Sequence, residues 1–207
     1  MSASIATNRP LRRHRLVAWC AVGVIVIGLL ATYAFFAFVN QPLTAGSDQG
    51  IYPPQAETAL DTLAGPVRLL PYVDGETLTL VQSLANTGPV DLSVTGVALS
   101  SQLSPAHAAF SVTEARAAIP AGLPCCGDID VAATWAAPRF NPMQLQPGQQ
   151  VAIALHLVIN QCNTTRVAVF QTLDSISVQY TVLGVSHTQD VQMDEAVGVK
   201  MPDTCPG

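Results

Sequence analysis

The residues from Leu16 to Val39 form an unbroken apolar run that contains no Asp, Glu, Lys, Arg, Asn, Gln or Pro. A helix of that length is about 36 Å long, which is enough to cross a hydrocarbon core of about 30 Å. Such a helix satisfies all its peptide groups internally, which is the condition for leaving water. The run therefore predicts a transmembrane helix over residues 16–39.

The charges that flank this run predict its orientation. Arg9, Arg12, Arg13 and Arg15 precede it, whereas the first charged residue after it is Asp48. Because basic residues stay on the cytoplasmic side, residues 1–15 are expected to be a cytoplasmic basic tail. A cleaved signal peptide is the alternative, but its apolar core is usually only about 7–15 residues long. We therefore expect a single-pass cell-membrane protein whose C-terminal domain is extracytoplasmic.

The part beyond the helix carries a strong negative charge. All fourteen acidic residues and only five of the nine basic residues follow Val39, so the formal charge of this part is −9. Such a surface repels nucleic acid and anionic lipid, and we expect neither as a partner of this domain. The scarcity of Lys and the abundance of Ala are typical of a GC-rich bacterial genome.

Residues 40–65 are expected to be an extracytoplasmic linker, because Pro and Gly recur through them. Within the linker, residues 55–64 carry apolar residues at the spacing of one short helix. From residue 66 onward the apolar period changes to two, which is the period of strands.

Alternation of this kind predicts seven to nine strands between residues 66 and 207. At Gly96 the apolar positions change face, which predicts a β-bulge. Leu183 and Gly184 separate two runs that are expected to pair as a hairpin. The segments that carry this alternation are 77–86, 90–100, 110–112, 129–135, 150–160, 176–182, 185–193 and 197–201.

The predicted fold class is therefore all-β, an immunoglobulin-like antiparallel β-sandwich ectodomain over residues 66–207, preceded by one transmembrane α-helix. Two segments also resemble bacterial immunoglobulin-like or fibronectin-III-like modules, SLANTGPVDLSVTGVAL (Ser83–Leu99) and LQPGQQVAIALHLVI (Leu145–Ile159). The chain is similar as well to single-pass bacterial membrane proteins that carry such an ectodomain, with which Cys162 and Cys205 match in position. The resemblance implies the fold and leaves the function open.

Four cysteines follow the apolar run, and an oxidising compartment favours disulfides between them. Cys125, Cys126, Cys162 and Cys205 allow three pairings, and the sequence leaves the choice among them open. A bond between Cys162 and Cys205 would close a long loop and contribute about 4 kcal/mol in the chain-entropy model. A redox pair or metal site is the alternative, but the chain has no Cys-x-x-Cys spacing.

Candidate ligands for a metal ion are few and widely spaced. No two of the histidines beyond the apolar run, His107, His156 and His187, have the i, i+2 or i, i+4 spacing that places ligands together. Acidic residues gather at Asp128 and Asp130, and again at Asp190, Asp194 and Glu195. A solvated sheet face explains both clusters without a bound cation.

Signatures of a catalytic nucleophile are absent, since the sequence has no G-x-S-x-G, S-x-x-K or H-E-x-x-H. We therefore expect no enzyme, no cofactor, and no catalytic, cofactor-binding or metal-binding residue. The first hypothesis is a module held in the bilayer by residues 16–39 that acts in protein–protein interaction or envelope scaffolding with an unidentified envelope protein. The alternative is a carrier domain for a ligand or metal ion, which predicts a stoichiometric ion that a chelator removes.

Overall fold

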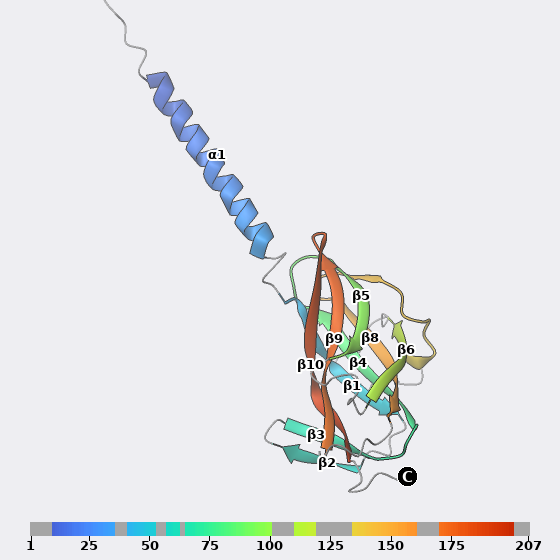
Figure 1. Ribbon diagram of the computed structural model, residues 1–207. Helices are drawn as coiled ribbons and strands as arrows, with labels where there is room; N and C mark the ends of the chain where they lie inside the picture. The colour runs from blue at the N-terminus through green and yellow to red at the C-terminus, as the bar shows by residue number, and fades with distance from the viewer. Residues whose placement is uncertain are drawn as a thin grey trace, which may run out of the picture. The chain divides into compact units, whose positions relative to one another are not determined.

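The computed structural model describes residues 10–35, 41–52, 57–62, 65–100, 110–118, 134–160 and 170–200. The chain divides into two compact units between Asn40 and Gln41. The first unit contains one helix, and the second contains all the strands (Figure 1).

Helix α1 runs from Pro10 to Ala34. Proline is tolerated at this first position, because the first N–H groups of a helix have no partner within it. In the described part of the chain, no helix combines the length and the hydropathy that a membrane crossing requires. The span expected over residues 16–39 continues past α1 into residues 36–39, which lie outside the described residues, and it stays a prediction.

The second unit is an all-β sandwich of two sheets (Figure 1). The smaller sheet has the order β1-β4-β8-β6, and all its neighbours are antiparallel. Its strands are β1 (Leu43–Tyr52), β4 (Thr77–Asn86), β8 (Gln150–Ile159) and β6 (Phe110–Ala118).

The larger sheet has the order β2-β3-β10-β9-β5-β7. Its neighbours are antiparallel except for β3 and β10, which pair in parallel. The expectation of a purely antiparallel sandwich was therefore wrong at this one pair. The strands are β2 (Glu57–Thr62), β3 (Gly65–Pro71), β10 (Val185–Lys200), β9 (Phe170–Val182), β5 (Leu92–Leu99) and β7 (Met143–Leu145).

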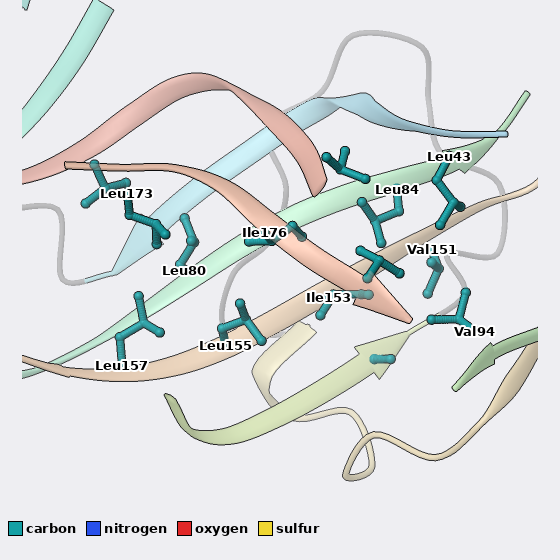
Figure 2. Packing of buried hydrophobic residues seen from close by; sticks show 14 of the residues in the cluster. Leu43, Leu80, Leu84, Val94, Val151, Ile153, Leu155, Leu157, Leu173 and Ile176 are labelled. Atoms are coloured by element: carbon teal, nitrogen blue, oxygen red, sulfur yellow. The ribbon is translucent and has the colours of Figure 1, made fainter. Parts of the chain in front are cut away.

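The main core fills the space between the sheets. The smaller sheet contributes Leu80 and Leu84 from β4 and the alternating side chains of β8, and the larger sheet contributes Val94 and Ile176 (Figure 2). All of these side chains are fully buried. The alternation in the sequence therefore specifies the register of each strand. A slip of one residue would move the apolar side chains of that strand from the core to the opposite face of the sheet.

Several sequence-based predictions are confirmed. Strand β4 has the predicted bounds, and β8 ends one residue earlier than expected. Strands β9 and β10 form the predicted hairpin around Leu183 and Gly184, which both have positive φ. The register of β5 against β9 shifts between Val94 and Gly96, which is the predicted bulge.

The linker prediction for residues 40–65 was wrong, because this segment contains β1 and β2. Of the short helix expected over residues 55–64, the described part from Glu57 to Thr62 is strand β2, which pairs with β3. Pairing with a neighbouring strand has overridden a helical apolar spacing that was too short to be stable alone. A strand was also predicted over residues 129–135. The two described residues of this run, Thr134 and Trp135, are helical, and the others lie outside the described residues.

Two glutamine side chains join β1 to β10 across the edge of the sandwich. Gln189 accepts a hydrogen bond from the backbone N–H of Leu43 at 3.3 Å, and its Nε2 donates to the carbonyl of Leu43 at 2.5 Å. The second bridge runs from the side chain of Gln49 on β1 to the backbone of Glu195 on β10. The Oε1 of Gln49 accepts from the N–H of Glu195 at 3.2 Å, and its Nε2 donates to the carbonyl of Glu195 at 2.7 Å. The backbone groups of Leu43 on β1 and of Glu195 on β10 are thereby satisfied by side chains of the other strand.

Candidate functional site

Charged and aromatic side chains gather on the outer face of the smaller sheet, beside its edge strand β6. Glu114 and Arg116 are two residues apart on β6 and so share a face, and register places them opposite His156 and Ala154 of β8. The segment 134–140 lies beside β6, where Phe140 N–H donates to the carbonyl of Ala115 at 2.9 Å and Arg139 forms an antiparallel bridge with Arg116. We call Glu114, Arg116, Trp135, Arg139 and His156 the outer-face cluster.

Trp135 occupies the centre of the outer-face cluster. The guanidinium carbon of Arg116 lies 4.6 Å from the centroid of its ring, a cation–π contact. The ring of His156 meets it edge to face, with centroids 4.9 Å apart. Beneath Trp135 lies a second, smaller apolar cluster made of Val81, Ala152 and Ala154, which are all buried. The short side chains leave room for the indole, which shields them from water.

Glu114 links the two arginines of the cluster. Its Oε1 lies 3.0 Å from Nη2 of Arg116 and 3.0 Å from Nε of Arg139. Nη1 of Arg116 also donates to the carbonyl of Ala137 at 3.0 Å. These contacts hold segment 134–140 against β6. The side chain of Arg139 is 81% exposed, so its remaining donors face solvent.

The outer-face cluster holds its one carboxylate, that of Glu114, between two arginines. It can orient a guanidinium toward a carboxylate or another anion, since arginine binds such groups in a bidentate manner. Its contacts brace segment 134–140 against β6 and leave Arg139 exposed to solvent.

The structure separates the described histidines. His156 lies on the outer face, opposite Leu155 and Leu157, as the alternation predicts. His187 pairs with Tyr180 across β10 and β9, and the two rings stack with centroids 5.2 Å apart. Burial raises the pKa of the Tyr180 hydroxyl, because the charged phenolate loses its hydration.

The acidic residues expected to cluster near the C-terminus have separate roles. Glu195 forms an ion pair with Arg68 at 2.7 Å, which ties β10 to β3. Asp190 and Asp194 are exposed. Within the ranges that the structure describes, no three His, Cys, Asp or Glu residues lie close enough to hold a metal ion.

Several predicted site residues lie outside the described residues, and their predictions stay untested. They include the ligand candidates His107, Asp128 and Asp130, and the four disulfide candidates Cys125, Cys126, Cys162 and Cys205. Cys20 is described and is an exposed free thiol on α1.

Sequence reasoning missed both the outer-face cluster and the glutamine bridges. A signal existed for Gln189, because it is a polar residue in phase with the apolar positions of its strand, including Val191. The signal for the outer-face cluster was weaker, since Trp135 is separated from β6 in the chain and only the fold brings them together.

Comparisons with known proteins add little to this geometry. No family model matches the chain, and no curated protein does. Among solved structures, 14 chains match. One is the cupredoxin domain of amoB from Nitrosocaldus yellowstonii, with 14% identity and a TM-score of 0.30. The match covers 63% of this chain and 61% of that domain's chain, and a likeness this weak carries no argument about function.

Proposed function

We propose that this protein is a membrane-anchored module whose immunoglobulin-like β-sandwich lies outside the cytoplasmic membrane. It acts there in protein–protein interaction or envelope scaffolding, without catalysis. Tethering confines the sandwich to the membrane surface, which raises its effective concentration near other envelope proteins.

The observation that carries the proposal is the apolar surface of α1. Trp19, Ile27 and Leu30 are 75%, 68% and 62% exposed, and the neighbouring Val, Ile and Leu residues are exposed on all sides of the helix. A helix that is apolar all round is found inside a large protein or inside a bilayer. The apolar run continues from α1 to Val39, which gives a bilayer-spanning length in the sequence.

The sandwich supports a role in binding rather than in chemistry. Ion pairs among its described residues connect separate elements. The pair between Arg68 and Glu195, for example, joins β3 to β10. The outer-face cluster contains the aromatic ring of Trp135 and presents Arg139 to solvent, and both aromatic residues and arginine are enriched at protein interfaces.

The anchor is tested by extraction of cell membranes with alkaline carbonate, which releases peripheral proteins only. We expect the wild-type chain to stay in the pellet. The double variant Ile25→Arg and Ile27→Arg adds about 3 kcal/mol per charge at the bilayer centre and should be found in the soluble fraction. The matched control, Ile25→Leu with Ile27→Leu, should stay in the pellet. Extraction of the wild-type chain would contradict the proposal.

The interaction role is tested by crosslinking in intact cells followed by purification of the full-length protein. Under the proposal, one envelope protein is recovered in constant ratio, and Arg139→Glu reduces its yield by reversing the exposed charge. A stoichiometric metal ion in the purified protein, removed by a chelator, would instead favour the carrier alternative.

A further inference from the structure

The tip of the β9–β10 hairpin has a residue that the turn itself disfavours. Leu183 has φ of 50° and Gly184 has φ of 81°, so both central residues of the turn are left-handed. Such two-residue turns strongly prefer Asn, Asp or Gly at the first position, because a bulky side chain is strained there. Leu183 is also 43% exposed. A strained, exposed apolar residue is the kind of local conflict that marks a function outside the fold.

This tip lies at the end of the sandwich where the chain enters from the N-terminal side. Strand β1 runs in the same direction as β10, since Leu43 bonds Gln189 and Gln49 bonds Glu195. The segment before Leu43 therefore arrives from the side of the hairpin tip. The β4–β5 loop lies at the same end, with the N–H of Thr87 bonded to the carbonyl of Pro42 at 2.8 Å. Figure 1 shows the β9–β10 turn at this end of the strands.

Chain length keeps this end near the predicted anchor. Four residue steps separate Val39 from Leu43, which span at most about 14 Å when fully extended. The hairpin extends five residues from Gln189 to Gly184, which is about 17 Å of strand. A chain held in the bilayer up to Val39 therefore has the hairpin tip within reach of the lipid surface.

Charge is sparse among the described residues at the end of the sandwich where lipid contact would occur. The hairpin residues 175–189 contain no Asp, Glu, Lys or Arg, in a part of the chain whose formal charge is −9. In the loop beside the tip, residues 86–91, Asp91 is the single charged residue. The opposite end of the sandwich carries Asp74, Glu76 and Lys200. Among the described residues, the tip end of the sandwich therefore carries less charge than the opposite end, and an anionic membrane repels it less.

We propose that the β9–β10 turn inserts Leu183 into the lipid surface next to the anchor and fixes the orientation of the sandwich relative to the membrane. This inference rests on the proposed function, because it requires the anchor. The strain at Leu183 is tolerated since the side chain that causes it makes the contact. The partner is the lipid surface itself, and a second copy of the chain is the competing occupant.

The test uses the full-length protein reconstituted in vesicles of phosphatidylcholine and phosphatidylglycerol. A photoreactive benzophenone side chain replaces exposed Ser186 beside the tip in one protein, and exposed Val73 at the opposite end in another. After illumination, lipid adducts are counted by mass spectrometry. We expect at least about a tenfold excess of adducts at position 186. Equal yields at the two positions, or adducts to a second copy in place of lipid, would overturn the proposal.

A second variant separates membrane contact from folding. Leu183→Asn suits the left-handed turn and should leave the fold intact or more stable, while it removes the apolar side chain. In the Ser186 benzophenone protein, it should lower the lipid adducts about tenfold, the equivalent of about 1.4 kcal/mol of buried apolar surface. Val73→Asn is the matched control and should leave the adducts unchanged. An unchanged yield in Leu183→Asn would contradict the role of Leu183.

Failure of this inference is distinguishable from failure of the anchor. Each reconstituted sample is also extracted with alkaline carbonate. If the protein stays with the vesicles but position 186 gives no excess of lipid adducts, the anchor stands and the tip contact is wrong. If the protein is extracted, the proposed function fails first.

Discussion

The side chain of Gln189 provides a sharp test of how the edge of the sandwich is closed. It satisfies the N–H and the carbonyl of Leu43, and both residues are buried. Gln189→Ala leaves two buried backbone groups without their partner, and each such loss costs about 1–3 kcal/mol. We expect unfolding to become easier by about 3 kcal/mol, a large part of the 5–15 kcal/mol typical of a domain.

The assay is urea unfolding of the full-length protein in mild detergent, followed by the strand signal in circular dichroism. Gln192→Ala is the matched control, because Gln192 is exposed on the same strand; its effect should stay within about 0.5 kcal/mol. Gln189→Glu keeps the acceptor but loses the donor when ionised, so its stability should rise as the pH falls and the carboxyl becomes protonated. Equal effects of Gln189→Ala and Gln192→Ala would refute the bridging role.

Three further predictions follow from described contacts. Gly46→Ala should destabilise the protein by about 1–3 kcal/mol in urea unfolding, because the new Cβ would lie 2.9 Å from the Cβ of buried Ser83. The double variant Gly46→Ala with Ser83→Gly removes this clash and should recover most of the lost stability. Trp135→Ala uncovers the small apolar cluster and should cost about 2 kcal/mol, whereas Tyr52→Ala, at a 60% exposed site, should cost under about 0.5. Burial raises the pKa of Tyr180 in the folded state, so the buried neutral hydroxyl favours folding. This contribution to the free energy of unfolding is complete below about pH 10, and it is lost as the pH rises through the folded pKa. Tyr180→Phe should therefore show a shallower alkaline loss of stability by circular dichroism.

The sequence predicted those strands whose apolar residues alternate without interruption. Strands β4 and β8 are the two central strands of the smaller sheet. One face of each is packed in the core, so the alternation of their own apolar side chains specifies their register. The hairpin at Leu183 and the bulge at Gly96 followed from local turn chemistry and from a change of face.

Strands β1 and β2 escaped prediction because tertiary contacts hold them. β1 contains Gly46 and Gly50 and buries few apolar residues, and it is held by its ladder with β4 and by the side chains of Gln49 and Gln189. β2 is an edge strand that owes its form to pairing with β3. The contacts of Gln49 and Gln189 join residues that are far apart in the chain, which no local pattern reveals, whereas β2 and β3 are close in the chain.

The outer-face cluster was predictable in part. Glu114 and Arg116 fall two residues apart, which places both on one face of any strand. Their partners Trp135 and Arg139 come from a segment whose position depends on the whole fold. His156 was assigned to the correct face, but its neighbour Trp135 was not foreseen.

The most direct test of the account is the topology of the chain in intact cells. A single cysteine is introduced at Val73 of the sandwich or at Ser4 of the N-terminal tail, in a chain whose own cysteines are replaced by serine. A membrane-impermeant maleimide is then added to the cells. The account predicts labelling at position 73 in whole cells, and at position 4 only after lysis. Labelling of position 4 in whole cells, or protection of both positions until lysis, would contradict it.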